Sequence, residues 1–253
     1  MIGFWTLFKR ESVRFLKDVL DTVAPPTVSV VLFLLIFSVA LGSRLGAVDG
    51  APYAQFMAPG LLLMAVVVNS FLNPAYSVFQ SRWDGNIADF LASPLSSAQI
   101  ALAVVAAGML RGLIVGGLVW ATAWLLVGFE VVAPGWTLAY LVVVSLAFSS
   151  LGSIVGLWTK GWEGVNTVSV FVLDPMVMLG GVFFSLEMVR EVPLLGTLTQ
   201  WNPFTTIVGG LRAAMLGASE VPFEAGLTFT AALALAFLAA ALTLYARGYH
   251  LKA

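Results

Sequence analysis

Cysteine is absent from this chain of 253 residues, and histidine occurs once, as His250. Without thiols the chain has no disulfide bond, no thiolate nucleophile and no cysteine-ligated metal, and one imidazole does not make a histidine cluster. The sequence also lacks the glycine-rich lysine motif of nucleotide-binding loops, a hydrolase serine motif and a convincingly spaced pair of carboxylates. We therefore expect a chain without catalytic residues, metal ligands or a cofactor of its own.

Charge is also scarce, since charged residues make up 10% of the sequence and hydrophobic residues 60%. In an average soluble protein about a quarter of the residues are charged. Several apolar runs approach or exceed the roughly 20 residues that a helix needs to cross a bilayer. The sequence thus predicts an all-α integral membrane protein with a single domain. A net charge of −1 says little about partners, and we expect membrane lipids but no nucleic acid among them.

Hydropathy divides the single domain, residues 1–253, into six regions around six transmembrane helices. The spans are expected at 27–43, 56–79, 100–127, 136–158, 165–184 and 223–245. The regions are an interfacial helix in 1–26, spans one and two in 27–79, a helical loop in 80–99, spans three to five in 100–184, an exterior helical segment in 185–222, and span six with the tail in 223–253.

The first region, 1–26, is expected to lie in the membrane interface. On a helical wheel, residues 4–21 gather aromatic and aliphatic side chains on one half and most charged ones on the other, which is typical of an amphipathic interfacial helix. Pro25 and Pro26 are predicted to break this helix. No small-residue cleavage site follows the first apolar run, so we expect no cleavable signal peptide and a retained first span.

The loop between spans two and three has its own helical pattern. Ile87, Phe90 and Leu91 fall on one side of a short helix, with Asp84 and Asp89 off that side. Pro94 is expected to end this helix. Ser96 and Gln99 have the spacing of a capping box, which predicts the start of the next helix.

Cationic residues decide the orientation. With both termini in the cytoplasm, the inside holds Lys9, Arg10, Arg14, Lys17, Arg82, Lys160, Arg247 and Lys252, whereas the outside holds Arg44, Arg190 and Arg212. The loop at 80–99 is then cytoplasmic. The segment 185–222 is exterior, and within it a helix is expected to begin at Asn202 and end at Gly217, with an apolar stripe half-sunk in the interface.

Two ionisable residues, Arg111 and Asp174, fall near mid-membrane at similar depth. A charge there is costly and is normally paired, so we predict that the two form an ion pair. Such a pair could serve only to link two helices, which we favour, or it could take part in transport. Asn69 and Asn73 form a polar step one turn apart, suited to hydrogen bonding between helices or to lining a substrate path. Glycines four residues apart in spans three and four predict close helix packing.

The order of these features resembles the type-2 ABC transporter permease family, and the resemblance covers nearly the whole chain. It is similar in particular to bacterial inner-membrane exporters of drugs, lipo-oligosaccharides and polysaccharides. The segments that carry it are Arg82, Gly85-Asn86-Ile87, Phe90-Leu91-Ala92-Ser93-Pro94, Arg111-Gly112-Leu113, Pro175, Leu179-Gly180-Gly181-Val182-Phe183-Phe184, Asn202-Pro203-Phe204, Gly210-Leu211-Arg212 and Leu216-Gly217.

This resemblance implies a homodimeric membrane pathway driven by two separate cytoplasmic ATPase subunits, which bind ATP and Mg. It makes the helix in 80–99 the coupling helix and the segment at 185–222 a re-entrant one. Docking on the ATPase then falls on Asp84, Gly85, Asn86, Ile87, Asp89, Phe90 and Leu91, with a smaller contribution from Gly161, Trp162 and Glu163.

The resemblance also gives a possible substrate path, made of Asn69, Asn73, Phe171 and Asp174. Asp174 departs from the family, whose members usually carry an uncharged residue before this proline. The function implied is the permease subunit of an exporter that moves an amphipathic drug, lipid or lipid-linked saccharide across the bacterial inner membrane by alternating access. The alternative from the residues themselves is an autonomous channel or an ion-coupled secondary transporter. A membrane enzyme is the third candidate, for want of catalytic groups.

Overall fold

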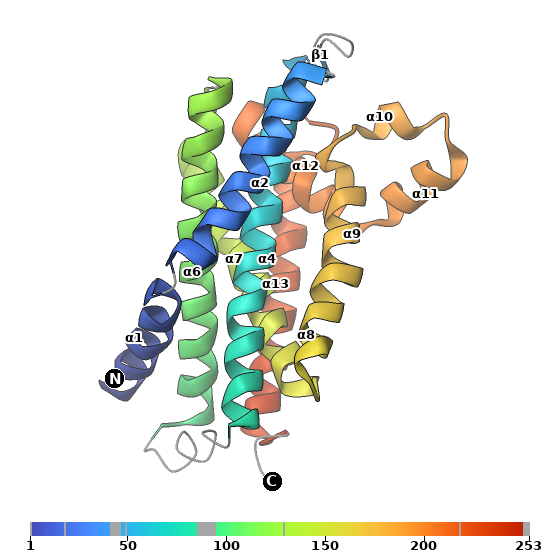
Figure 1. The fold of residues 1–253 in the computed structure, drawn as a ribbon. Helices are drawn as coiled ribbons and strands as arrows, with labels where there is room; N and C mark the ends of the chain where they lie inside the picture. The colour runs from blue at the N-terminus through green and yellow to red at the C-terminus, as the bar shows by residue number, and fades with distance from the viewer. Residues whose placement is uncertain are drawn as a thin grey trace.

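The computed structural model describes residues 2–17, 19–40, 47–48, 50–84, 95–128, 130–217 and 219–249, and most of them are helical. Figure 1 shows a bundle of long helices with the smaller elements toward one end. The long helices are α1 (Ile2–Lys17), α2 (Val19–Ala40), α4 (Tyr53–Trp83), α6 (Ser97–Val127), α7 (Pro134–Trp158) and α13 (Phe223–Ala246).

One further membrane-length helix changes its winding along its course. It consists of α8 (Trp162–Val168), η1 (Ser169–Leu173), α9 (Asp174–Val177) and η2 (Met178–Val182), in which η1 and η2 are π-helical. The smaller elements are the strands β1 (Ala47–Val48) and β2 (Ala51–Pro52), which form an antiparallel hairpin, and the helices α10 (Leu186–Val189), α11 (Pro193–Trp201) and α12 (Pro203–Leu216).

Five helices among the described residues are long and apolar enough to cross a membrane, which makes this an all-α, multi-pass membrane protein. They begin and end close to the predicted spans two to six: 53–83, 97–127, 134–158, 162–182 and 223–246. The predicted first span, 27–43, falls mainly within α2, where residues 24–37 form a shorter apolar stretch. Residues 41–43 lie outside the described part, so the count of six spans stays a prediction.

The predicted break at Pro25 and Pro26 is wrong. Helix α1 ends at Lys17 and α2 begins at Val19, so both prolines lie inside α2. Each proline removes one backbone donor, but membrane helices tolerate prolines where neighbouring groups satisfy the freed carbonyls. Both prolines are therefore accommodated within the helix.

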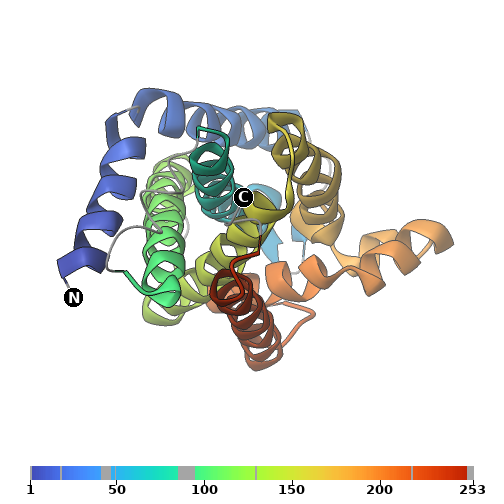
Figure 2. The ribbon, with the colours of Figure 1, turned by 90° about the horizontal axis from the view of Figure 1, so that it is seen from below.

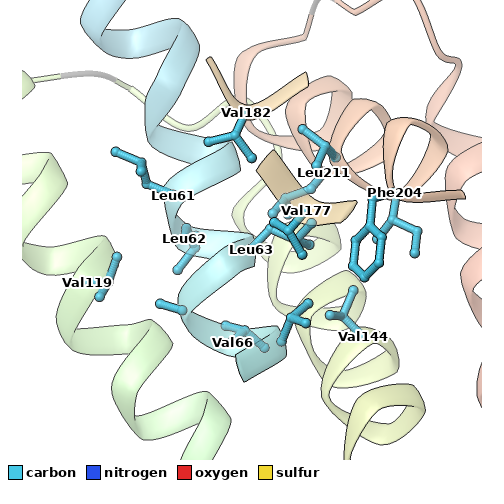
Figure 3. Close-up of a cluster of buried hydrophobic side chains, with 14 of the residues drawn as sticks. Leu61, Leu62, Leu63, Val66, Val119, Val144, Val177, Val182, Phe204 and Leu211 are labelled. Carbon is cyan, nitrogen blue, oxygen red and sulfur yellow. The ribbon is translucent and has the colours of Figure 1, made fainter. Parts of the chain in front are cut away.

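Helix α4 is the centre of the bundle. It is the most buried of the five membrane-length helices, and Figure 2 shows it surrounded by α2, α6, α7 and α8. Figure 3 shows Leu61, Leu62, Leu63 and Val66 of α4 packed among side chains from four other segments. Those partners are Val119, Val144, Val177, Val182, Phe204 and Leu211.

Close contact between helices depends on glycine, as predicted. A Cβ at Gly152 of α7 would collide with the backbone oxygen of Phe71 on α4. A Cβ at Gly112 of α6 would collide with the side chain of Ser70, also on α4. Small residues therefore let α6 and α7 approach the central helix from two sides.

The helices begin and end where side chains satisfy their terminal backbone groups. At the start of α6, Ser96 Oγ accepts from the backbone N–H of Gln99 at 3.2 Å and Gln99 Oε1 accepts from that of Ser96 at 3.0 Å, so the predicted capping box is confirmed. At the start of α12, Asn202 Oδ1 accepts from the N–H of Phe204 at 3.0 Å. Gly217 ends α12 with φ of 73°, a left-handed conformation that favours glycine.

The apolar stripe of α12 was expected to face the membrane interface, but it faces protein. Its members Phe204, Ile207, Val208, Leu211 and Met215 are all buried. The reason is that α12 packs against α4, α7, α13 and η2, which together cover the stripe. Tyr140 of α7 fixes this arrangement, because its hydroxyl donates to the backbone oxygen of Ile207 at 3.0 Å.

The two ends of the bundle hold different elements (Figure 1). One end, called here the α1 end, holds α1, the end of α4, the start of α6 and the connection between α7 and α8. The other, called the hairpin end, holds β1, β2, α10 and α11. The segment predicted as exterior and the loop predicted as cytoplasmic therefore attach to opposite ends of the bundle.

Candidate functional site

A cavity of about 340 Å³ lies between α2, α4, α6 and α9. Its size falls in the range of small-molecule sites, which measure roughly 300–1,000 Å³. Most of its wall is apolar, and a few polar groups reach it from α2, α4, α6 and α9. The lining residues are Pro25, Pro26, Ser29, Val30, Phe33, Leu61, Met64, Ala65, Val68, Asn69, Leu72, Arg111 and Asp174.

Arg111 and Asn69 form the polar part of the wall on one side. Arg111 Nη2 donates to Asn69 Oδ1 at 3.4 Å, and Asn69 Nδ2 donates to the backbone oxygen of Ala65 at 2.9 Å. Arg111 Nε is buried and has no hydrogen-bond partner in the described part of the chain. In the described part of the chain, one weak hydrogen bond, to Asn69, therefore holds the guanidinium at the cavity.

Asp174 contributes the negative charge of the cavity. Its Oδ1 is buried and, among the residues the structure describes, accepts no hydrogen bond. Asp174 is the first residue of α9 and follows the π-helical segment η1, with Pro175 next to it. π-Helical turns are rare and are found often at functional sites.

The predicted ion pair is not formed in this structure. No nitrogen of Arg111 lies within 4.0 Å of a carboxylate oxygen of Asp174. Among the described residues, the ion pair that the structure contains joins Arg14 to Glu11. Arg111 is directed to Asn69 on α4, whereas Asp174 reaches the cavity from α9. The two residues therefore line the same cavity without forming an ion pair.

The other two residues of the expected path do not line this cavity. Asn73 is 2% exposed, and its backbone oxygen accepts from Arg14 Nη2 at 3.4 Å. Phe171 is 75% exposed on the outer side of the helix that contains η1. The structure therefore brings Asn69 and Asp174 together and leaves Asn73 and Phe171 apart from them.

An aromatic cluster stands beside the cavity. Phe33 lines the cavity, and its ring centroid lies 5.5 Å from that of Phe183, just after η2. Phe37 lies 5.4 Å from the same ring. These contacts fasten α2 to the helix that carries Asp174.

A buried arginine supports the end of that helix. Arg212 of α12 is 5% exposed, and it donates from Nη2 to the backbone oxygen of Gly181 at 2.7 Å and from Nε to that of Phe56 at 3.3 Å. Its guanidinium carbon lies 3.7 Å from the centroid of the Phe56 ring. Gly181 has φ of 88°, so its carbonyl is presented outside regular helical geometry. Sequence reasoning placed Arg212 outside the membrane and missed this contact.

The predicted ATPase-docking residues attach to the α1 end. Asp84 is exposed at the end of α4, and Trp162 and Glu163 are exposed at the start of α8, directly after Gly161. Gly85, Asn86, Ile87, Asp89, Phe90 and Leu91 lie outside the described residues.

Arg82 joins the two segments that flank these docking residues. Its Nη1 donates to the backbone oxygens of Gly156 at 3.0 Å, Leu157 at 2.7 Å and Thr159 at 3.0 Å. These are carbonyls at the end of α7, which lack helical partners and favour a cation. Sequence reasoning included Arg82 in the family pattern but gave it no role. A cation two residues before Asp84, in the last turn of α4, was the available signal.

Aromatic side chains strengthen the same connection. The ring of Phe79 on α4 meets that of Trp162 edge to face at 4.9 Å, and Tyr76 lies 5.8 Å from Trp162. The Tyr76 hydroxyl donates to Asn166 Oδ1 at 2.5 Å. The last two turns of α4 and the first turn of α8 therefore pack as one unit.

Helix α1 is attached to α4 by a buried carboxylate. Glu11 is 2% exposed, accepts from Ser77 Oγ at 2.5 Å and pairs with Arg14 at 3.2 Å. Leu7 and Phe15 are buried with it, whereas Trp5 is 64% exposed. The predicted two-sided wheel is therefore incomplete, because one strip of α1, containing a charge, faces the bundle. The spacing of Leu7, Glu11 and Phe15, four residues apart, was the signal for this strip.

Among the described residues, no group of three or more histidine, aspartate or glutamate side chains is placed to hold a metal ion.

Comparison with known proteins agrees with this architecture. A family model described as ABC-2 type transporter matches residues 2–216. The chain is 34% identical over 221 residues to the inner membrane transport permease YadH of Escherichia coli (strain K12), covering 87% of this chain and 86% of that protein. It is 25% identical over 211 residues to nodulation protein J of Sinorhizobium fredii, covering 79% and 75%. The corresponding protein of Azorhizobium caulinodans is 24% identical over 187 residues, covering 72% of each chain.

Proposed function

Because this chain belongs to the ABC-2 type transporter family, a family of membrane transport permeases, we propose that it is the membrane-spanning subunit of an ATP-driven exporter. In this proposal two copies form the pathway, and two separate cytoplasmic ATPase subunits supply the energy by binding ATP and Mg. The chain itself is not an enzyme. It resides in the bacterial inner membrane with six spans and with both termini, and hence the α1 end, in the cytoplasm.

The observation that supports this function best is the bonding of Arg82 to the end of α7. It connects the segment before the predicted coupling helix with the segment before Gly161, Trp162 and Glu163. A push on either docking segment is then transmitted to α4, which is the centre of the bundle. A channel that opens by itself has no need for two rigidly connected surfaces at one end.

The substrate of this exporter is an amphipathic drug, lipid or lipid-linked saccharide. The name of the relative YadH gives transport at the inner membrane and no substrate, so the support comes from the cavity. Its wall is mostly apolar, with Ser29, Asn69, Arg111 and Asp174 as polar residues. Phe171 and the exposed side chains beside it face away from the cavity. We propose that they contact the second copy of the chain.

Alternating access follows if the substrate and the nucleotide favour different conformational states of the two-copy assembly. A ligand shifts a conformational equilibrium only as far as its affinities for the two states differ. ATP-driven closure of the motor subunits is passed through the coupling helix to α4 and α8. Since α4 and α9 both line the cavity, their movement changes its shape.

Co-purification with the ATPase tests the proposal. A triple variant, Asp84→Lys, Asp89→Lys and Phe90→Ala, is expected to lose most of the bound ATPase and the transport it drives. The control is Glu130→Lys, which reverses a charge beyond the opposite end of α6. Unchanged ATPase association in the triple variant would remove the case for this docking surface.

The competing function is an autonomous channel or an ion-coupled secondary transporter. The buried and unpartnered Oδ1 of Asp174 is the observation that favours it, because intramembrane carboxylates serve ion coupling. Transport by the purified chain in vesicles without any ATPase, driven by an ion gradient, would establish this alternative. Transport that requires both the ATPase and ATP would exclude it.

A further inference from the structure

We propose that the cavity between α2, α4, α6 and α9 binds an amphiphile whose polar end carries an anionic group and a cationic group together. Such a zwitterionic headgroup would place its anion on Arg111 and its ammonium on Asp174, with an acyl chain along the apolar wall. This inference rests on the proposed function and deepens it by naming the class of substrate.

The first argument is the state of the two charges. Arg111 Nε and Asp174 Oδ1 are both buried at the cavity, and neither has a hydrogen-bond partner among the described residues. A buried charged group without a partner is costly, more so at membrane depth. The two side chains do not relieve each other, because no ion pair within 4.0 Å joins them. Both residues line the cavity, so a ligand group of the opposite sign can approach each side chain there.

The second argument is that one charge alone fits poorly. A purely anionic headgroup would satisfy Arg111 but would bring a like charge toward Asp174 in the same cavity. A purely cationic drug would satisfy Asp174 and be repelled by Arg111. Asn69 does not change this balance, because its amide already donates to Ala65 and accepts from Arg111. A headgroup that carries both an anionic and a cationic group can pair with Arg111 and with Asp174.

The third argument is the apolar remainder of the wall. Val30 and Phe33 of α2 face Leu61, Met64, Val68 and Leu72 of α4 across the cavity. These side chains suit an alkyl chain, since burying apolar area is favourable by about 25 cal/mol per Å². The other face of α2 carries exposed apolar side chains, namely Val28, Leu32, Leu35 and Ile36. The cavity is therefore separated by a single helix from a face suited to lipid.

Lipid binding by the purified chain tests the proposal. Native mass spectrometry in detergent would compare phosphatidylethanolamine, which is zwitterionic, with phosphatidylglycerol, which has the same phosphate and no amine. The chain is expected to bind phosphatidylethanolamine about tenfold more tightly, the factor that one charge-assisted hydrogen bond supplies. Equal binding, or tighter binding of phosphatidylglycerol, would overturn the proposal.

Two variants assign the polar contacts. Asp174→Asn is expected to bind both lipids but to lose the preference for phosphatidylethanolamine over phosphatidylglycerol. Arg111→Gln is expected to weaken both about tenfold or more. Asp174→Glu keeps the charge and is expected to keep the preference, so it separates the loss of charge from a folding defect. The matched controls are Glu130→Gln and Arg190→Gln, at exposed positions outside the cavity. A preference unchanged in Asp174→Asn would contradict the proposal.

Soluble phosphoethanolamine distinguishes a lipid from a free zwitterion. Without an acyl chain it is expected to compete only at concentrations at least about a hundredfold above those of the lipid, because the apolar wall then contributes nothing. If phosphoethanolamine bound as tightly as the lipid, the ligand would be a soluble molecule, and the proposal of an amphiphilic ligand would be overturned.

The outcome is separable from that of the proposed function. If the ATPase co-purifies but the lipid preference is absent, this inference fails and the exporter stands. If the lipid preference is present but no ATPase associates, the exporter fails, and the cavity remains a lipid site without a transport role.

Discussion

Arg82 Nη1 donates to the backbone oxygen of Leu157 at 2.7 Å, which fixes the last turn of α4 to the last turn of α7. Two more carbonyls, those of Gly156 and Thr159, accept from the same nitrogen. One charged nitrogen thus serves the carbonyls at the end of α7, and a neutral side chain cannot supply a charged donor there.

Substituting Arg82 should therefore loosen the α1 end. In Arg82→Gln the carbonyls lose a charged donor, and we expect a loss of about 1–3 kcal/mol of stability. Measured by thermal unfolding in detergent, the midpoint should fall by several degrees. Arg82→Lys should recover part of the loss, and Arg190→Gln, at an exposed position, should leave the midpoint unchanged. A midpoint equal to that of the native chain in Arg82→Gln would mean that these bonds contribute little.

Coupling provides a second measurement on the same variant. If Arg82 transmits movement between the docking segments, Arg82→Gln should retain bound ATPase while substrate stimulates ATP hydrolysis less. Loss of both association and stimulation would point instead to a general folding defect.

The buried Glu11 should hold α1 against α4. Glu11→Ala removes the acceptor of Ser77 and the partner of Arg14, which leaves polar groups unpaired at a buried contact. Hydrogen exchange in residues 2–17 is expected to accelerate about tenfold or more, while exchange in α6 stays the same. Lys9→Ala, at an exposed site of the same helix, serves as the control. Equal exchange in Glu11→Ala and Lys9→Ala would contradict the role of Glu11.

Glycine packing can be tested with a matched pair. Gly152→Ala places a methyl group against the backbone oxygen of Phe71, which cannot move aside as a side chain end could. We expect it to cost about 1–3 kcal/mol, as overpacking does. Gly117→Ala, on α6, meets nothing within 4 Å and is expected to be neutral or to stabilise by up to about 1 kcal/mol. Thermal unfolding in detergent measures both, and equal effects would exclude a special role for the α4–α7 crossing.

Arg212 should stabilise the joint between α12, α4 and η2. Arg212→Met keeps much of the side-chain volume but leaves the carbonyls of Gly181 and Phe56 without its donors. An unsatisfied buried acceptor costs about 1–3 kcal/mol, so the variant is expected to unfold at a clearly lower temperature. Arg190→Met at the exposed position is the control. Equal melting of the two variants would show that the buried contacts are replaced by others.

Helix boundaries were largely predictable because they depend on local chemistry. Ser96 with Gln99, and Asn202 with Gly217, satisfy terminal backbone groups in the way their positions in the sequence indicate. Pro25 misled the prediction because a proline's effect in a membrane helix depends on neighbouring elements, which the sequence does not display.

The faces of helices were less predictable than their ends. The wheel of α1 separates apolar from charged side chains but cannot show that Glu11 meets Ser77, 66 residues away. Likewise, counting residues along the spans predicted a similar depth for Arg111 and Asp174, and both line one cavity. The direction of each side chain depended on how the helices pack and wind.

The winding of the helix from Trp162 to Val182 has a mechanical consequence. A π-helical turn holds one residue more than an α-helical turn, so the chain beyond it is out of phase by about 100°. Asp174 lies between the two such turns, η1 and η2. The wider winding before Asp174 therefore sets the direction of its side chain, and an unbroken α-helix with the same sequence would direct that side chain about 100° further round the helix axis.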